Sequence, residues 1–163
     1  MDSPAQPFIR NYLVSENAGR AKGEPGFRAP NDADPDGVSG ALYPVFIEPR
    51  DGPPAPGERS DNENNADAIV SLIYTGGIST GVLEKFHRKL TFDFWIRSRT
   101  PQLAAAIESR LRFLLHDKRN WDMAGLSVIE SLEWRPMQPV GNGPEGYGYT
   151  LSYLFELYAE GGL

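Results

Sequence analysis

Residues 90–97 alternate between apolar and polar side chains more regularly than any other segment of the chain. Successive side chains of a β-strand point to opposite faces, so this alternation predicts a strand that is buried on one side only. The buried side must be covered by a second apolar element. The buried face would carry Leu90, Phe92, Phe94 and Ile96, and the other face Thr91, Asp93, Trp95 and Arg97.

A helix is predicted to begin directly after this strand. Thr100 is a suitable N-cap, and Pro101 fits the first helical position. Glu108 and Arg112 have the i,i+4 spacing of an ion pair on the solvent side. The pattern therefore predicts a helix over about 101–118 that covers the strand. Its apolar stripe would consist of Leu103, Ala104, Ile107, Leu111, Leu114 and Leu115.

The remaining apolar segments predict one short helix and four further strands. Pro44 would suit an edge strand, because proline cannot donate a hydrogen bond to a neighbouring strand. The last two strands, joined by a Gly- and Pro-rich connection at 135–148, are most simply an extended hairpin. In the first of these two strands, the residues expected on one face are Leu126, Val128, Leu132 and Trp134. The helix is expected over 7–14, and the strands over 41–49, 68–75, 126–134 and 149–159.

These elements predict an α+β fold. An antiparallel sheet of about four or five strands would carry one principal helix on one face, with long polar loops. A chain of 163 residues is most simply one domain, here 1–163. Its 17 Gly and 14 Pro are concentrated in an N-terminal arm or loop at about 15–40 and a long loop at about 48–67. The arm has too few large apolar residues to build a core of its own.

Net charge and composition exclude several classes of function. A net charge of −6 argues against a general nucleic-acid-binding protein, which needs a positively charged surface. The absence of cysteine excludes disulfides, thiolate metal sites and cysteine nucleophiles. No segment approaches the ~18 continuous apolar residues of a membrane-spanning helix, and the first thirty residues do not resemble an export signal. We therefore expect a protein that is made in a cytoplasm-like compartment and has no membrane partner.

Motifs of catalysis and metal binding are not found. His87 and His116 lie too far apart in sequence for a paired metal motif, and His116 is predicted to be a solvated surface residue away from the apolar helix stripe. Glu130 and Glu133 would point to opposite faces of a strand, as ordinary solvent-facing or edge residues. The glycines of "TGGISTG" have the spacing of a phosphate loop, but Val82 replaces the lysine that such a loop needs. We predict no catalytic, cofactor-binding or metal-binding residue.

The segment "FWIRSR" interleaves aromatic and basic residues at the end of the predicted strand. Trp95, Arg97 and Arg99 would be exposed there. Three interpretations remain open: a protein interface, an ordinary exposed surface, or a surface on which single-stranded nucleic acid stacks. Trp and Arg are enriched at protein interfaces, and the acidic total disfavours nucleic acid. Trp134 and Arg135 are further candidates for contacts with another subunit or partner.

The order of elements from about residue 68 to the end resembles the tail terminator (tail completion) proteins of long-tailed bacteriophages. The segments that carry the resemblance are "RKLTFDFWIRSRTP", "QLAAAIESRLRFLLHD", "LSVIESLEWRP" and "YTLSYLFELYA". In that family, a strand with an aromatic and basic end leads directly into a helix rich in alanine and leucine. Two long strands then complete the domain.

The resemblance implies a virion structural protein. Members of the family form a homo-oligomeric ring, a hexamer, that caps the tail tube and joins it to the connector at the head. The implied partners are other copies of the chain, the tail tube protein and the head–tail connector, with DNA only passing through the lumen. Assembly would take place in the host cytoplasm. Such a ring needs two different faces on each subunit. The candidates for them are the exposed side of "FWIRSR" and the loops at 48–67 and 135–148.

Two alternatives remain beside the tail terminator. The first is another phage neck protein, such as a head-completion or connector protein. The second belongs to a different class, a small α+β enzyme or ligand-binding domain. Replacing both histidines with alanine would inactivate an enzyme that uses them, whereas assembly of a structural protein would continue.

Overall fold

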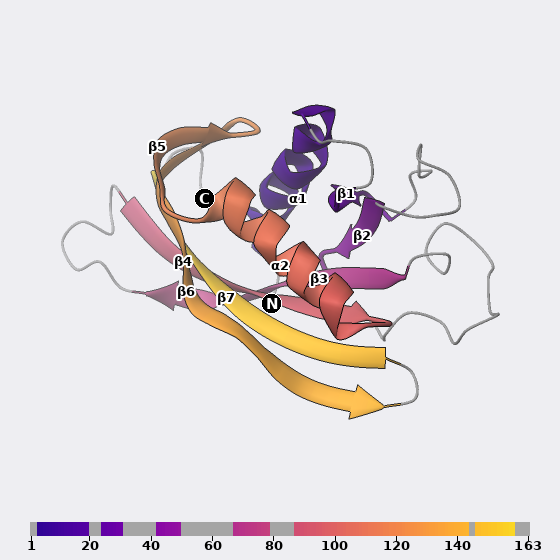
Figure 1. Ribbon diagram of the computed structural model, residues 1–163. Helices are drawn as coiled ribbons and strands as arrows, with labels where there is room; N and C mark the ends of the chain where they lie inside the picture. The colour runs from indigo at the N-terminus through magenta and orange to yellow at the C-terminus, as the bar shows by residue number, and fades with distance from the viewer. Residues whose placement is uncertain are drawn as a thin grey trace.

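The structure is a computed structural model that describes residues 3–19, 24–30, 42–49, 67–78, 87–143 and 146–158. This part of the chain is mostly β, with 59% of it in strands. Seven strands form one mixed sheet that curls into a half-barrel, and α2 lies across its concave side (Figure 1). Neither α-helix within the described ranges is long and apolar enough to cross a membrane.

The strands lie in the order β1-β2-β3-β4-β7-β6-β5. Strands β1, β2 and β3 are mutually parallel, and all other neighbours are antiparallel. The helices are α1 (Gln6–Ser15), the short 3-10 helix η1 (Glu16–Gly19) and α2 (Pro101–Leu115). The strands are β1 (Gly26–Arg28), β2 (Leu42–Phe46), β3 (Ala68–Ile78), β4 (His87–Ser98), β5 (Lys118–Met123), β6 (Leu126–Gly143) and β7 (Gly146–Tyr158).

The predicted strand–helix unit is confirmed in its main features. Phe92, Phe94 and Ile96 of β4 are fully buried, whereas Trp95 and Arg97 are exposed. The backbone N–H of Leu103 donates to Thr100 Oγ1 at 3.2 Å, so the N-cap of α2 forms as expected. The helix ends earlier than predicted. Its last residue is Leu115, because the backbone is extended at His116 and has a positive φ of 53° at Asp117.

The predicted fold class is wrong in three respects. The sheet has seven strands and not four or five, it is mixed and not purely antiparallel, and it carries two helices and not one principal helix. The second helix, α1, is the short helix that was expected over 7–14. Strand β1 lies inside the predicted arm at 15–40, yet Phe27 is fully buried. Strand β5 has mostly polar residues, and its first residue was assigned to the end of the helix. Neither strand has the apolar alternation on which the prediction relied.

Strand β2 is not the edge strand that Pro44 was expected to mark. It lies between β1 and β3. Proline is tolerated because Pro44 stands opposite Arg28 of β1, whereas pairing with β3 begins only at Val45. The predicted loop at 48–67 lies mostly outside the described residues, and so do 20–23 and 31–41 of the predicted arm.

The largest local error of the sequence prediction is the assignment of faces along strand β6. Its pairing with β7 shifts register at four places, the first of them at Ile129. A shift of one residue exchanges the two faces of a strand. Val128 precedes the first shift and faces the core as predicted. Leu132 and Trp134 follow it and do not face the core. Leu132 stands opposite Leu154, and Trp134 is 44% exposed. The β6–β7 hairpin is confirmed, but 135–148 is not a long loop: β6 continues to Gly143 and β7 starts at Gly146.

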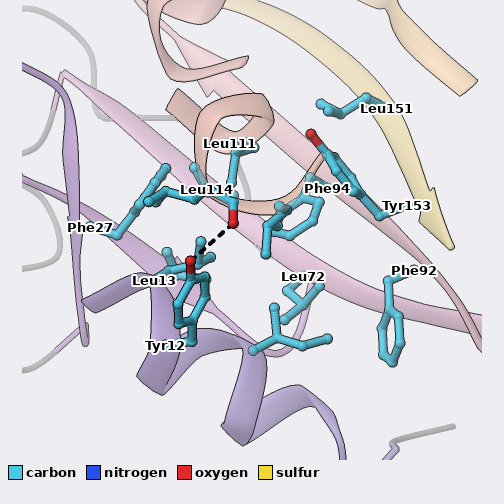
Figure 2. Close-up of a cluster of buried hydrophobic side chains, with 14 of the residues drawn as sticks. Tyr12, Leu13, Phe27, Leu72, Phe92, Phe94, Leu111, Leu114, Leu151 and Tyr153 are labelled. Carbon is cyan, nitrogen blue, oxygen red and sulfur yellow. Dashed lines mark hydrogen bonds between the residues drawn. The ribbon is translucent and has the colours of Figure 1, made fainter. Parts of the chain in front are cut away.

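The core lies between α2 and the concave face of the sheet (Figure 2). Phe94 of β4 and Tyr153 of the neighbouring strand β7 meet edge to face, with ring centres 5.5 Å apart. Edge-to-face contact is a favoured geometry for aromatic rings. The largest fully buried side chains include Phe27, Phe92, Phe94, Tyr153, Phe155, Leu72, Ile107 and Leu111.

Helix α1 contacts β1, β3 and β5, and so connects the two edges of the half-barrel. Its Tyr12 hydroxyl donates to the carbonyl of Leu114 at 3.0 Å (Figure 2) and accepts from Lys118 Nζ at 2.8 Å. The Tyr12 ring also lies 4.7 Å from that of Trp121 in β5. At the other end of α1, the side-chain amide of Gln6 donates to Leu72 O at 2.8 Å. These contacts hold the sheet in its curled form.

Candidate assembly surface

The outer face is the side of β4, β7 and β6 that points away from α2. Pairing between β4 and β7 places Asp93 opposite Ser152, Trp95 opposite Thr150 and Arg97 opposite Gly148. Their neighbours in sequence, such as Phe94 and Tyr153, fill the core on the other side. The strand alternation that builds the core therefore also determines which side chains the outer face presents.

A hollow of about 350 Å³ lies on the outer face where β4, β6 and β7 run together. We call it the outer groove. Trp95 is 40% exposed and Val140 is 61% exposed, so apolar surface is open to solvent within it. Its lining includes Asp93, Trp95, Arg97, Val140, Gly148 and Thr150.

Gly148 keeps the outer groove open. A Cβ atom at this position would lie 3.3 Å from Val140 Cγ2 and 3.5 Å from the carbonyl oxygen of Gly141. The first of these distances is tighter than ordinary van der Waals contact, so any side chain would have to displace Val140. Val140 itself is the additional residue of a register shift in β6, between Pro139 and Gly141. The bulge thus places an apolar side chain at the edge of the groove.

The outer groove carries an acid and a base that have no ionic partner in the described part of the chain. The Ser152 hydroxyl donates to Asp93 Oδ1 at 2.6 Å, but no cation pairs with this carboxylate there. Arg97 makes neither an ion pair nor a hydrogen bond with any described residue. Asp93 and Arg97 are four residues apart on the same strand, which separates them by roughly 13 Å along it, and Trp95 lies between them.

The structure separates Arg99 from the other predicted contact residues. Arg99 Nε lies 3.2 Å from Asp67 Oδ1, and its backbone N–H donates to Asp67 O at 3.0 Å. Arg99 therefore connects the end of β4 to the start of β3. Arg135 stacks its guanidinium 5.2 Å from the ring centre of Trp134 and stands opposite Ser152. It therefore lies two strands away from Asp93 in the same row of the sheet.

Of the predicted contact residues, Trp95 and Arg97 lie in the outer groove itself. Val140 and Gly148 lie within 135–148, a segment that was expected to contact a neighbouring subunit but was interpreted as a loop and not as paired strand. A single signal pointed to them: the two strands around this segment had to form a hairpin, and a hairpin can extend into its own glycine-rich part. The positions of the bulges, which place Val140, have no comparable sequence signal.

A second group of polar residues lies on the concave side, between α2 and β6. We call Glu108, Arg112, Glu133 and Tyr153 the carboxyl cluster. The side chain of Glu133 is only 6% exposed, with Arg112 Nε 3.1 Å from its Oε2. Arg112 also lies 3.9 Å from Glu108, so the predicted i,i+4 pair exists, but Glu108 is 16% exposed and not fully solvated. Glu133 was expected to be solvent-facing, and this prediction is wrong because the bulge at Ile129 turns it inward.

Burial and the neighbouring Glu108 raise the pKa of Glu133 to about 7, and Arg112 opposes this shift only in part. Burial also raises the pKa of Tyr153, with the negative charges of Glu133 and Glu108 acting in the same direction. The Tyr153 hydroxyl makes no hydrogen bond within the described part of the chain. The cluster therefore favours a protonated Glu133, because a low-dielectric site with two carboxyl groups disfavours two negative charges.

His116 supports this cluster from the end of α2. Its Nδ1 accepts a hydrogen bond from the backbone N–H of Glu133 at 3.0 Å. A half-buried acceptor of this kind is not the solvated surface residue that the helical wheel predicted. Glu130 lies on the opposite face from Glu133, as expected, and its Oε1 is 3.6 Å from Arg119 Nε. The two glutamates do not form a catalytic pair.

The two sites differ in what they can do. The carboxyl cluster can hold a proton and tie α2 to β6, but Glu133 does not line the outer groove. The outer groove can take an apolar or aromatic group between two opposite charges. Within the described ranges, no three His, Asp or Glu side chains gather as a metal site would need.

The chain was also compared with known proteins. No protein-family model matches it, and a search of curated proteins gives no match.

Proposed function

We propose that this protein is a virion structural subunit, a tail terminator that assembles into a ring through its outer face. The observation that carries this proposal is the outer groove, where Trp95 and Val140 are exposed beside Asp93 and Arg97. An apolar centre with charged flanks and an exposed tryptophan is typical of protein interfaces.

The phage context rests on the resemblance in the order of elements. That order corresponds to β4, α2, β6 and β7, with β5 as an additional strand between α2 and β6. In the proposed assembly, the ring caps the tail tube and meets the head–tail connector. DNA passes through the lumen, where an acidic chain with a net charge of −6 would bind it weakly. The ring would be a hexamer, assembled in the host cytoplasm and retained in the virion.

Size-exclusion chromatography with light scattering tests this proposal directly. The purified chain is expected to give a closed oligomer, and electron micrographs should show rings and rings bound to the ends of tail tubes. Trp95→Ala is expected to shift the population to monomers, because it removes the aromatic side chain of the groove. Arg119→Ala, whose ion pair with Glu130 lies outside the groove, is the control and should assemble normally. A strict monomer that never binds tube ends would contradict the proposal.

A second experiment separates a terminator from another neck protein. Tails are assembled with and without the protein and measured by electron microscopy. Tails longer than normal indicate a terminator, since the tube then has no cap. Tails of normal length beside unattached heads indicate a head-completion or connector protein instead.

A further inference from the structure

Phe113 is the most exposed large apolar residue in the described part of the chain, at 74%. It lies on the side of α2 that is turned away from the sheet, next to the buried Leu114. The Arg110 guanidinium lies 5.4 Å from the centre of its ring and also donates to Glu16 O at 3.2 Å. We call Phe113 and Arg110 the Phe113 corner. A single exposed phenylalanine is common on protein surfaces, so it indicates a partner only if a complementary site exists.

The outer groove has a volume that can hold the Phe113 side chain and an acidic group for Arg110. Its volume of about 350 Å³ is in the range that holds a small organic group, and Trp95 offers an aromatic ring for contact with the phenylalanine. The cation that accompanies Phe113 is Arg110, and the groove contains Asp93, which has no cationic partner in the described part of its own chain.

The two surfaces lie on opposite sides of the molecule. The residues of the outer groove point away from α2. Figure 1 shows that α2 covers the concave face of the half-barrel. A copy can therefore use both surfaces at once, each with a different neighbour. Repeated contacts between two unlike surfaces produce a ring when the rotation closes.

We propose that the outer groove of one copy takes the Phe113 corner of the next copy, with Phe113 against Trp95 and Arg110 near Asp93. This inference rests on the proposed function and specifies its contact. The competing arrangement pairs two outer grooves about a two-fold axis, so that Asp93 of each copy meets Arg97 of the other. The geometry favours the Phe113 corner, because two convex faces touch over a small area, whereas a groove is filled by a protruding side chain.

Cysteine cross-linking tests the contact without background, because the chain has no cysteine. Ser109→Cys lies in the hollow beside Phe113 and leaves Phe113 intact, and Val140→Cys lies in the outer groove. The two variants are mixed in equal amounts and treated with a short bismaleimide. Cross-linked dimers are expected in the mixture and not in either variant alone. Ser127→Cys mixed with Val140→Cys is the matched control and should give none.

A charge exchange gives an independent result. Asp93→Lys and Arg110→Glu should each shift the oligomer to monomers by at least tenfold in dissociation constant, and the double variant should recover assembly. Thermal unfolding followed by circular dichroism shows whether each variant is folded. If the wild-type chain forms rings but the mixture does not cross-link and the double variant does not recover, the proposed contact is wrong and the ring proposal stands. Cross-linking of Val140→Cys alone shows the two-fold arrangement, which overturns the contact. A monomeric wild type overturns both.

Discussion

The concave and convex sides of the same three strands differ in how far their side chains are buried. On the concave side, Phe94 and Tyr153 pack in the core, and even the buried Glu133 has Arg112 and Glu108 beside it. On the convex side, Trp95 is 40% exposed, and Arg97 has no partner in the described part of the chain. The comparison teaches that one strand can fill the core with one set of side chains and leave the alternate set exposed for the association that we propose.

The sharpest way to break this comparison is to truncate two neighbours on β4. Phe94→Ala should lower the free energy of unfolding by about 3–5 kcal/mol, because it leaves a cavity in the core. Trp95→Ala should lower it by about 1 kcal/mol or less and instead prevent assembly. Urea unfolding and light scattering measure the two effects. Equal losses of stability would show that the two faces are not separate in function.

The carboxyl cluster adds a pH dependence to the concave side. The pKa of Glu133 is about 7 in the folded chain and 4.5 without its surroundings, so between these values the folded state binds a proton that the unfolded state has released. The contribution of Glu133 to the free energy of unfolding is therefore fully present below about pH 4.5 and is lost as the pH rises to about 7. Glu133→Gln should remove this loss and stabilise the protein at pH 8 by about 1–3 kcal/mol.

Urea unfolding from pH 4 to 8 measures this difference between the wild type and Glu133→Gln. Glu130→Gln, on the outer side of the same strand, is the control for removing one negative charge. The groups facing Glu133 are Glu108 and Arg112 from α2, Tyr153 from β7 and His116 at the helix end. A constant difference between the two proteins over this pH range would contradict the assigned protonation.

The smallest effect is expected where α1 joins the end of α2 and the start of β5. Tyr12→Phe removes the hydrogen bonds to Leu114 O and from Lys118 Nζ, and should lower the free energy of unfolding by about 1 kcal/mol. Tyr158→Phe, at the 38% exposed end of β7, is the control and should change it by less than about 0.5 kcal/mol. Thermal unfolding compares the two. If both variants lose the same amount, the Tyr12 contacts do not stabilise the closed half-barrel.

Sequence reasoning worked where periodicity and local chemistry agree. Spacing and local residue chemistry predicted the strand at 90–97, the Thr100 cap and the apolar stripe of α2. The structure contains all three. Trp95 and Arg97 were identified for the same reason, since the outward residues of a strand are known once its inward ones are.

The remainder depended on contacts that a pattern does not contain. Strand β1 has three residues, and only pairing with β2 shows that it is a strand. The inward turn of Glu133 and the place of Val140 follow from bulges in β6, and one additional residue reverses every later side chain. The raised pKa of Glu133 comes first from its burial and then from Glu108 of α2, which is distant in sequence.

The bridging position of α1 also has a consequence for the order of events in folding. Tyr12 bonds to Leu114, 102 residues further along the chain, so a helix made early in synthesis completes its contacts only after Lys118 has been added. Contacts between residues so distant in sequence slow folding, because a long loop must close before they form. The half-barrel therefore closes late, and α1 is expected to dock after the strands that it connects.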